Sequence, residues 1–431
     1  MHAAPQAHGY PQPGPSLSFA ESMKRFSRIV FVDYWPYWAG TVAAGILNVL
    51  LFAVSGSIWG VTSEFTRWGG HLLRLAGVDV SGWLYFQEIR MLGLPWEQTS
   101  GWLVIGMFLG AFAGALVSGN FKIRVPRQKI RLLQGFVGGT LSGFGARLAM
   151  GCNLGSFFSA IPQFSFHGWL FMAGLFAGTY IGTKIALLPF MVGRPAILRR
   201  SQTAPEPQGG SWRERAKPYL GGVVFLAIGT GAAYYLATGR TDLGLFMLFG
   251  AGFGFIIERA RICFTSAFRE LWITRQADLA RAIALGMMVA TVGFAVIGYA
   301  GQPFRPQWAS YGTLLGGLIF GIGIVIAGGC ETGWMYRSSE GYVQLWMAGL
   351  GTITGSVILA WAWDHAGIYR WLVEGSPKVD LSLAWGWPAA ILATLALLAA
   401  WFMFSTWWET RSRAPSYIRS PRTAQPTPRS R

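Results

Sequence analysis

Residues 139–155 read GTLSGFGARLAMGCNLG, and residues 317–333 read GLIFGIGIVIAGGCETG. The two stretches align without a gap at an offset of 178, so that Cys152 matches Cys330. Similarity at a fixed spacing indicates an internal repeat. Both copies are apolar runs that end in a glycine–cysteine break, which predicts two membrane helices interrupted at equivalent places. The matched glycines are Gly143 with Gly321, Gly145 with Gly323, Gly151 with Gly329 and Gly155 with Gly333.

The whole chain has the composition of a membrane protein. Of its 431 residues, 52% are hydrophobic and only 12% are charged, whereas a soluble domain has roughly 25% charged residues. A water-soluble fold of this composition could not cover its surface with polar groups. The composition therefore excludes a soluble enzyme, a DNA-binding protein and a disordered scaffold. We expect an all-α polytopic membrane protein with broken or re-entrant helices and an internal repeat.

Ten apolar runs are candidates for spans, which need about 20 residues each. The sixth run is short enough to be re-entrant, and the chain would then have nine spans in place of ten. With ten spans, both termini lie on the same side of the membrane. The runs are 29–56, 101–119, 132–151, 168–190, 219–237, 244–257, 282–300, 312–329, 343–362 and 384–404.

The positive charge of the chain is concentrated between these runs. Four short segments carry +16 of the net charge of +17, and ten spans place all four on one side. Basic segments next to spans normally face the cytoplasm. The distribution therefore predicts cytoplasmic termini in contact with a lipid bilayer, and no nucleic-acid partner. The four segments are 1–28, 120–131, 191–217 and 405–431.

The same segments divide the chain into two halves. Span parity makes the first copy of the repeat run outward and the second inward, so we expect an inverted repeat. Segment 57–100 is too polar to span and is expected to form a helix pair on the membrane surface. The expected divisions are a disordered cytoplasmic tail (1–28), a first transmembrane half (29–190), a basic cytoplasmic linker (191–217), a second transmembrane half (218–404) and a basic cytoplasmic tail (405–431).

Three cysteines are the candidate substrate-binding residues: Cys152, Cys263 and Cys330. Each lies within two residues of a glycine or a charged residue at the end of an apolar run. A single membrane cysteine is usually a small packing residue, but three in such surroundings favour a binding path. A thiol is a weak donor and a soft, polarisable group, which suits a sulfur- or selenium-containing anion better than phosphate. With an odd count and no CxxC pair, we expect no disulfide framework, metal site or cofactor.

Polar and charged neighbours of the cysteines are candidate supporting residues. A broken helix exposes backbone N–H groups that bind anions, and an ionisable side chain at membrane depth marks a functional site by default. The alternative for these charges is mutual salt bridging or a place at the interface. The candidates are Arg147, Gly151, Asn153, Gly155, Glu258, Arg261, Thr265, Gly329, Glu331, Thr332 and Arg337.

Four segments resemble the YeeE/YedE sulfur-transport membrane family, and within it the YedE/FdhT branch of selenium metabolism membrane proteins. They are 57–70, 143–165, 258–274 and 323–341. The resemblance implies a bacterial inner-membrane permease, whose better-understood relatives pass thiosulfate along a line of cysteines through S–H···S contacts. It assigns that path here to Cys152, Cys263 and Cys330. The sequence around the cysteines is that of selenium-associated members, so thiosulfate and a selenium oxyanion both stay open as substrates.

Two other functions also stay open. One is a membrane relay protein in which a cysteine forms a persulfide or selenosulfide for a cytoplasmic sulfur or selenium carrier protein. The other is a non-transporting subunit that docks a cytoplasmic partner through the basic segments. A relay needs a thiolate beside a cation, which the sequence offers only at Cys263, through Arg261. A docking anchor needs no interrupted spans, so the sequence favours a permease over an enzyme or an anchor.

Overall fold

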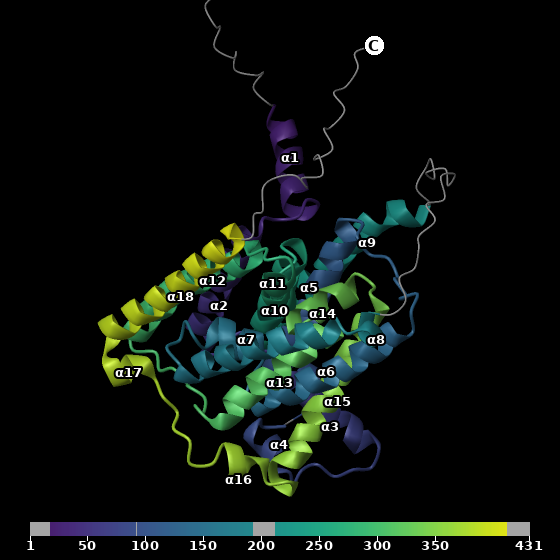
Figure 1. The fold of residues 1–431 in the computed structure, drawn as a ribbon. Helices are drawn as coiled ribbons and strands as arrows, with labels where there is room; N and C mark the ends of the chain where they lie inside the picture. Colours follow the sequence, from purple (N-terminus) through teal and green to yellow (C-terminus); the bar gives the residue numbers. More distant parts are fainter. Residues whose placement is uncertain (1–17, 92, 193–211, 412–431) are drawn as a thin grey trace, which may run out of the picture.

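The computed structural model describes residues 18–91, 93–192 and 212–411, and within them all regular structure is helical. Ten long helices coincide with the ten predicted spans (Figure 1). They are α2 (Tyr37–Ser55), α5 (Thr99–Val117), α6 (Ile130–Leu148), α7 (Phe166–Ala186), α9 (Trp212–Ala237), α10 (Thr241–Arg259), α12 (Asp278–Tyr299), α13 (Tyr311–Ala327), α15 (Val343–His365) and α18 (Trp387–Thr410).

The shorter elements connect or interrupt these helices. They are α1 (Phe19–Phe31), α3 (Thr62–Leu75), α4 (Leu84–Glu88), η1 (Pro95–Glu97), the π-helix η2 (Asn153–Ser159), α8 (Pro189–Val192), α11 (Phe264–Ile273), α14 (Glu331–Ser339), α16 (Ile368–Leu372) and α17 (Leu381–Trp385).

The helices confirm a multi-pass membrane protein. Eight segments of the described chain are both long and apolar enough to cross a bilayer. They include the segment Thr241–Ile273, which joins α10 to α11, and α10 alone has 19 residues, so the sixth run is no half-span. The long helices α6 and α7 fall outside those eight because they carry polar residues such as Gln134, Arg147 and His167, and these three side chains are buried. Helix α6 packs against α13 and α15, so its polar groups face protein.

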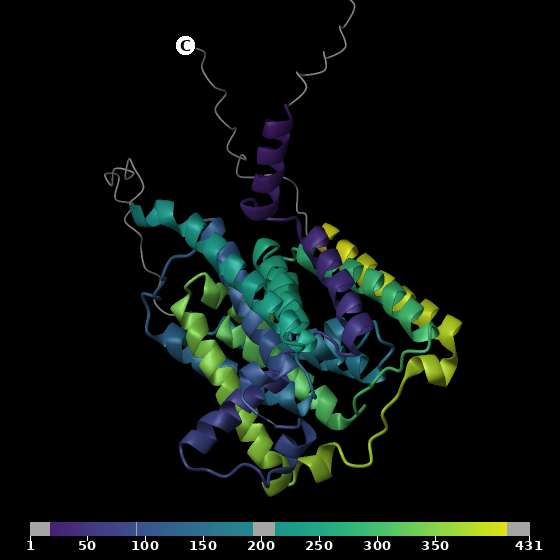
Figure 2. The same cartoon turned by 180° about the vertical axis from the view of Figure 1, so that it is seen from behind.

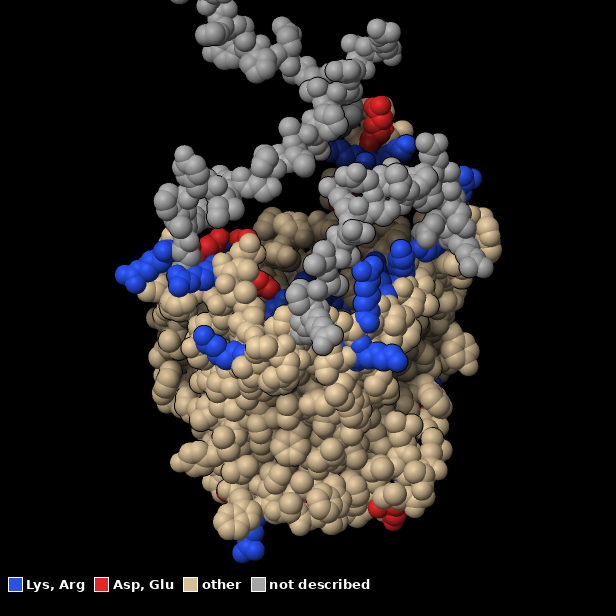
Figure 3. All heavy atoms as spheres, turned by 45° about the vertical axis from the view of Figure 1, so that its right-hand side comes forward, with Lys and Arg blue, Asp and Glu red and all other residues tan. Residues whose placement is uncertain are grey.

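Contacts between helix ends define two sides of the molecule. We call one side the terminal side, because α1 and the end of α18 lie there. On this side, Arg259 at the end of α10 donates to the carbonyl of Val32 after α1 and to Ser118 after α5. Arg281 at the start of α12 pairs with Glu409 near the end of α18 on the same side. Figures 1 and 2 place α1, the start of α9 and the end of α18 together there. Figure 3 shows Lys and Arg side chains gathered toward this side, above a wall that carries few charges.

The opposite, distal side contains the ends of α6 and α15 and the short helix α4. The hydroxyl of Tyr85 in α4 meets Arg147 at the end of α6, and the N–H of Leu84 donates to Asp364 near the end of α15. Each of these long helices therefore runs from the terminal side to the distal side.

Glycine contacts between α6 and α13 confirm the inverted repeat. A Cβ on Gly138 would lie 2.7 Å from the carbonyl oxygen of Gly323, and one on Gly145 would lie 2.6 Å from that of Gly316. The contact order reverses along the second helix, so the two helices are antiparallel. In the repeat, Gly138 corresponds to Gly316 and Gly145 to Gly323. The contact of Gly138 with Gly323 is therefore the symmetric counterpart of the contact of Gly145 with Gly316. The repeats are thus related by a local two-fold axis between α6 and α13.

The same symmetry relates the outer helices. Helix α2 packs along α12 in one half of the molecule, and α10 packs along α5 in the other. Likewise α15 covers α6 while α7 covers α13. In the repeat, α5 corresponds to α12 and α7 to α15. The packing partner of α12, which is α2, therefore corresponds to the packing partner of α5, which is α10. The short helices that follow them, α3 and α11, correspond in the same way.

Three sequence-based boundaries need correction. Residues 19–28, expected to be disordered, belong to α1, which Ser18 and Glu21 begin with a capping box. Helix α3, expected on the membrane surface, buries Glu64 and Phe65 and packs against α15. The expected linker begins inside α8 and ends inside α9, and the expected carboxyl tail begins inside α18. Residues 193–211 of the linker and 412–431 of the tail lie outside the described chain.

We expect Gly145→Ala to destabilise the protein, because its new Cβ would lie 2.6 Å from the backbone of Gly316. Overpacking of this kind costs about 1–3 kcal/mol. Gly222→Ala in α9 is the control, since nothing lies within 4 Å of its Cβ. Thermal unfolding in detergent, followed by size-exclusion chromatography, should show a lower midpoint for the first variant only. Equal midpoints would contradict the close approach of α6 and α13.

Candidate functional site

Three long helices, α6, α10 and α13, end with the same kind of turn. The turn contains one residue of positive φ, which is Met150 (57°), Arg261 (52°) or Gly328 (81°). After α6 the N–H of Gly151 closes the turn on the carbonyl of Ala146 at 2.8 Å, the 6→1 bond of a Schellman motif. Left-handed backbone is rare for residues other than glycine, so tertiary contacts hold the turns at Met150 and Arg261.

A cysteine follows two residues after each of these turns. Cys152, Cys263 and Cys330 are the N-cap residues of η2, α11 and α14. The first backbone N–H groups of a helix have no partner within that helix, so they are available near each thiol. A fourth break lies between α2 and α3, where Val61 is the N-cap. Val61 is therefore the counterpart of Cys263, which the sequence did not reveal.

Two of the three thiols are adjacent. The Sγ atoms of Cys263 and Cys330 are 3.9 Å apart, and the N–H of Phe264 donates to the Cys330 sulfur at 3.2 Å. The hydroxyl of Thr332 lies 3.2 Å from the same sulfur. A Cβ on Gly333 would lie only 2.6 Å from the Cys263 sulfur, so this position needs glycine to accommodate the pair. All three cysteines are at most 1% exposed.

Cys152 lies apart from this pair, on the wall of a distal cavity of about 520 Å³. Gly155 and segments of α3, α4 and the turn after α2 also line the cavity. Its charged lining residues are four arginines and one glutamate, so the cavity has a formal excess of positive charge. These residues are Arg67, Arg90, Arg147, Arg305 and Glu88.

Arg147 provides the buried charge of this cavity. Arg147 is only 1% exposed. Its Nε donates to the Tyr85 hydroxyl at 2.6 Å, and its Nη1 donates to the Ser63 hydroxyl at 3.2 Å. Both partners are neutral, and no carboxylate among the described residues lies within 4.0 Å of the guanidinium. A buried cation without a counter-ion is unfavourable, and an anion in the cavity would supply one.

Three polar side chains beside the cysteines have buried atoms that lack hydrogen-bond partners within the described chain. They are the amide of Asn153, the hydroxyl of Thr265 and Oε1 of Glu331. Each residue is at most 1% exposed. Since buried polar atoms are normally paired, these groups are available to a ligand held between the broken helices.

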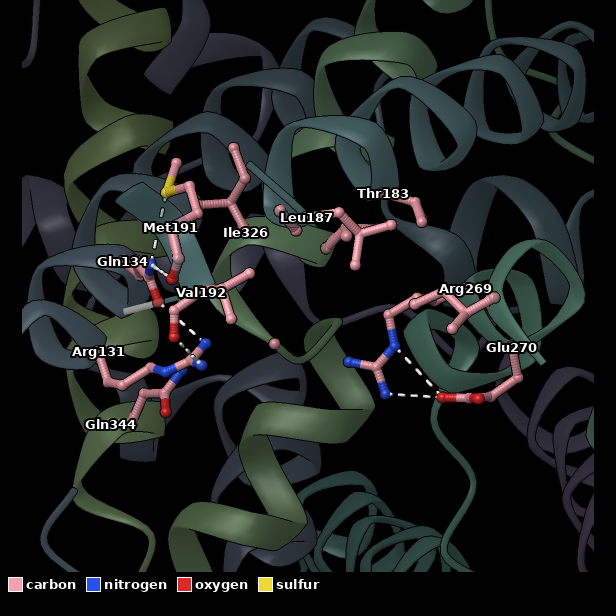
Figure 4. Close-up of a pocket in the computed structure, with 14 residues that line it drawn as sticks. Arg131, Gln134, Thr183, Leu187, Met191, Val192, Arg269, Glu270, Ile326 and Gln344 are labelled. Carbon is pink, nitrogen blue, oxygen red and sulfur yellow. Dashed lines mark hydrogen bonds and ion pairs between the residues drawn. The ribbon is translucent and has the colours of Figure 1, made fainter. Parts of the chain in front are cut away.

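A second cavity, of about 300 Å³, opens on the terminal side (Figure 4). Arg131 and Gln134 of α6 lie at one side of it, and the ion pair of Arg269 with Glu270 faces them across apolar side chains. The length of α6 between Arg131 and Arg147 separates the two cavities by about 24 Å. Cys263 and Cys330 line neither of these cavities, so they lie in the closed centre of the protein.

The remaining predicted site residues have structural contacts. Glu258 forms a buried pair with Arg259, which holds the chain between α1 and α2. Arg261 lies over the ring of Tyr34, and Arg337 donates to the carbonyl of Gly328 at 3.1 Å. Gly151 and Gly329 belong to the turns after α6 and α13.

Sequence reasoning missed several residues that line the distal cavity or contact Arg147. Ser63, Arg67 and Tyr85 come from the segment expected on the membrane surface, and Arg305 precedes α13. No spacing in the sequence relates these segments to Cys152. For the residues in 57–100, the signal was a segment too polar to span that carries Trp and Tyr.

Fold and site define a multi-pass membrane protein whose broken helices carry three cysteines into a buried centre. The chain belongs to the family described as sulphur transport, whose model matches residues 9–181 and 259–429. It is similar over nearly its whole length to two proteins named probable transporter YedE. The protein from Escherichia coli strain K12 is 43% identical over 390 residues, 90% of this chain and 96% of that protein. The protein from Salmonella typhimurium strain LT2 gives the same figures.

Shorter matches extend to proteins named thiosulfate transporter TsuA. The Escherichia coli K12 protein is 38% identical over 104 residues, which are 24% of this chain and 30% of that protein. The Spirochaeta thermophila protein is 30% identical over 184 residues, 38% of this chain and 56% of that protein.

Mild oxidation should distinguish the adjacent thiols from the third. We expect copper–phenanthroline to join Cys263 to Cys330, because their sulfurs at 3.9 Å need only a small shift to reach the disulfide distance of about 2.05 Å. Peptide mass spectrometry should find Cys152 free. Cys152→Ala should preserve the cross-link and Cys330→Ala should abolish it. A disulfide that includes Cys152 would contradict the arrangement.

Proposed function

We propose that the protein is a permease, and no enzyme, that carries a small sulfur- or selenium-containing anion into the bacterial cytoplasm. The anion passes from the distal cavity to Cys152, then to Cys263 and Cys330, and leaves through the terminal cavity. The observation that carries this proposal is the unpaired, buried Arg147 beside Cys152 in a cavity with excess positive charge. Such a cavity concentrates anions from solution at its mouth.

The basic residues support a direction for this path. They gather on the terminal side (Figure 3), and basic segments next to spans normally face the cytoplasm. In a bacterial inner membrane, the distal cavity would then open to the periplasm. Both chain termini would be cytoplasmic.

The chemistry of the centre suits an anion with one soft and several hard atoms. Thiols contact a polarisable sulfur or selenium atom, while the N–H groups of three helix N-termini attract negative charge. The unpartnered amide of Asn153 and hydroxyl of Thr265 are donors for oxygen atoms. Thiosulfate, with a terminal sulfur and three oxygens, matches this set.

The choice between sulfur and selenium rests on the relatives. The partial matches are named thiosulfate transporters, whereas the relatives matched over nearly the whole chain are named only as probable transporters. Thiosulfate is therefore the first substrate to test, and a selenium oxyanion such as selenite is the second.

A sulfur relay is the second candidate, and the 3.9 Å separation of the Cys263 and Cys330 sulfurs is the observation that favours it. In a relay, a cysteine thiolate would attack the outer sulfur of thiosulfate, the S–S bond would break, and sulfite would leave. The persulfide would then pass to a cytoplasmic carrier. A permease releases intact thiosulfate and forms no sulfite, so the two functions are separable by product analysis.

Replacing Cys263 should test the role of the thiol. We expect Cys263→Ser and Cys263→Ala to lower thiosulfate uptake into liposomes by about tenfold or more, because a hydroxyl is hard and a methyl group is no donor. The protein should stay folded, as judged by size-exclusion chromatography. Thr274→Ala, at the end of α11, is the control. Wild-type rates in both cysteine variants would make the thiol a packing residue and contradict the path.

Reporter fusions should test the orientation. We expect cytoplasmic signals for fusions after residues 210 and 431, because both follow basic segments. A fusion after residue 310, on the distal side, should give a periplasmic signal. A periplasmic signal at 210 or 431 would contradict the proposed direction.

A further inference from the structure

We propose that Glu331 is a proton-binding site that couples movement of the anion to movement of a proton in the same direction. The inference rests on the proposed transport function and adds its driving force. It comes from the position of one buried carboxyl group between the cysteines and Arg147.

Glu331 follows Cys330 at the start of α14 and is 1% exposed. Its Oε2 accepts a hydrogen bond from Trp334 Nε1 at 2.6 Å, and its Oε1 has no partner in the described chain. The Trp334 ring packs against Phe65 and Phe108, so the surroundings are apolar. An ionised carboxylate with a single hydrogen bond is unfavourable there. The protonated group keeps its bond to Trp334 and gains a free O–H donor.

The charged groups around Glu331 leave it without an ion-pair partner. Arg147 is the charged side chain within electrostatic reach of it, and the Cys152 thiol is also within reach. Helix α5 and η2, which pack on α14, carry no charged residue. Charged groups on the other packed elements, and on α14 itself, are held elsewhere or lie at far helix ends. They are Glu64 with Arg67 on α3, Glu258 with Arg259, Arg269 with Glu270, Arg337 on the carbonyl of Gly328, Glu340 at the far end of α14, and Asp242, Asp364 and His365.

This arrangement links the anion to the proton. An anion bound at Arg147 takes over the positive charge that otherwise favours ionised Glu331, and it adds negative charge of its own. Both effects favour protonation of Glu331. By linkage, a protonated Glu331 must favour anion binding by the same factor.

In the proposed cycle, one proton binds with each anion and is released with it. Water on the distal side delivers it to Oε1, where an O–H bond forms as the anion binds beside Cys152. The O–H group donates to an oxygen atom of the anion, next to the donors of Asn153 and Thr265. When the anion leaves toward the terminal side, the O–H bond dissociates and the proton passes to water on that side. One anion and one proton cross together, with no change in oxidation state.

Proton movement is measurable in the wild-type protein without any variant. We would reconstitute it in vesicles of phosphatidylethanolamine and phosphatidylglycerol, with pyranine inside and valinomycin and potassium holding the membrane potential at zero. Adding thiosulfate outside should acidify the lumen. A pH difference of one unit, acid outside, should drive labelled thiosulfate to as much as about tenfold its concentration outside. Exchange of thiosulfate without acidification would overturn the coupling and leave the transport proposal intact. Absence of any exchange would overturn both.

Glu331→Gln should separate exchange from coupling, because an amide donates like the protonated carboxyl group but releases no proton. We expect gradient-driven accumulation to disappear, so that the thiosulfate concentrations inside and outside the vesicles become equal, while exchange at equal pH stays measurable. Glu340→Gln is the matched control, since Glu340 is also buried at 2% exposure, just beyond α14, and it should accumulate thiosulfate as the wild type does. Accumulation by Glu331→Gln equal to the wild type would overturn the proposal.

Discussion

A helix that stops at membrane depth leaves backbone N–H and C=O groups that lipid cannot satisfy, and the fold depends on covering them with protein. Helices α6, α10 and α13 are each followed by a short helix that begins at a buried cysteine. Their turns are closed by internal hydrogen bonds, and glycine contacts bring α6 and α13 close enough to bury the ends. The interruptions that would be costly in lipid therefore become the polar centre of the protein. Three of them present a cysteine at the first position of the next helix.

The same constraint concerns any anion that enters the centre. Moving a dianion against an inside-negative potential costs about 4.6 kcal/mol per 100 mV, at about 2.3 kcal/mol per charge, which is a factor of roughly two thousand in concentration. Fixed groups such as Arg147 lower the barrier within the protein but cannot supply this energy. A carboxyl group that binds a proton together with the anion removes one charge from the transfer. This is the physical reason to consider Glu331 together with Arg147.

The two-fold symmetry of the backbone is broken in its side chains. Cys152 and Cys330 are equivalent, but Cys263 corresponds to Val61, and Arg147 corresponds to Val325. The distal cavity contains four arginines and one glutamate, whereas the terminal cavity contains two arginines and one glutamate. A symmetric scaffold thus carries a path with different ends, which suits transport that has a direction.

The sequence by itself determined the class of protein, the ten long helices and the repeat, because apolar length and the 178-residue spacing are local properties of the chain. It also gave Cys152, Cys263 and Cys330, with neighbours such as Asn153 and Glu331, as candidate site residues. It could not show that Val61 corresponds to Cys263, or that the first turns of α3 are buried and pack against α15. Nor could it show that Glu258 pairs with Arg259 while Arg147 pairs with no carboxylate. These facts depend on contacts between segments tens to hundreds of residues apart, so only tertiary packing decided which charges are neutralised and which remain available to a ligand.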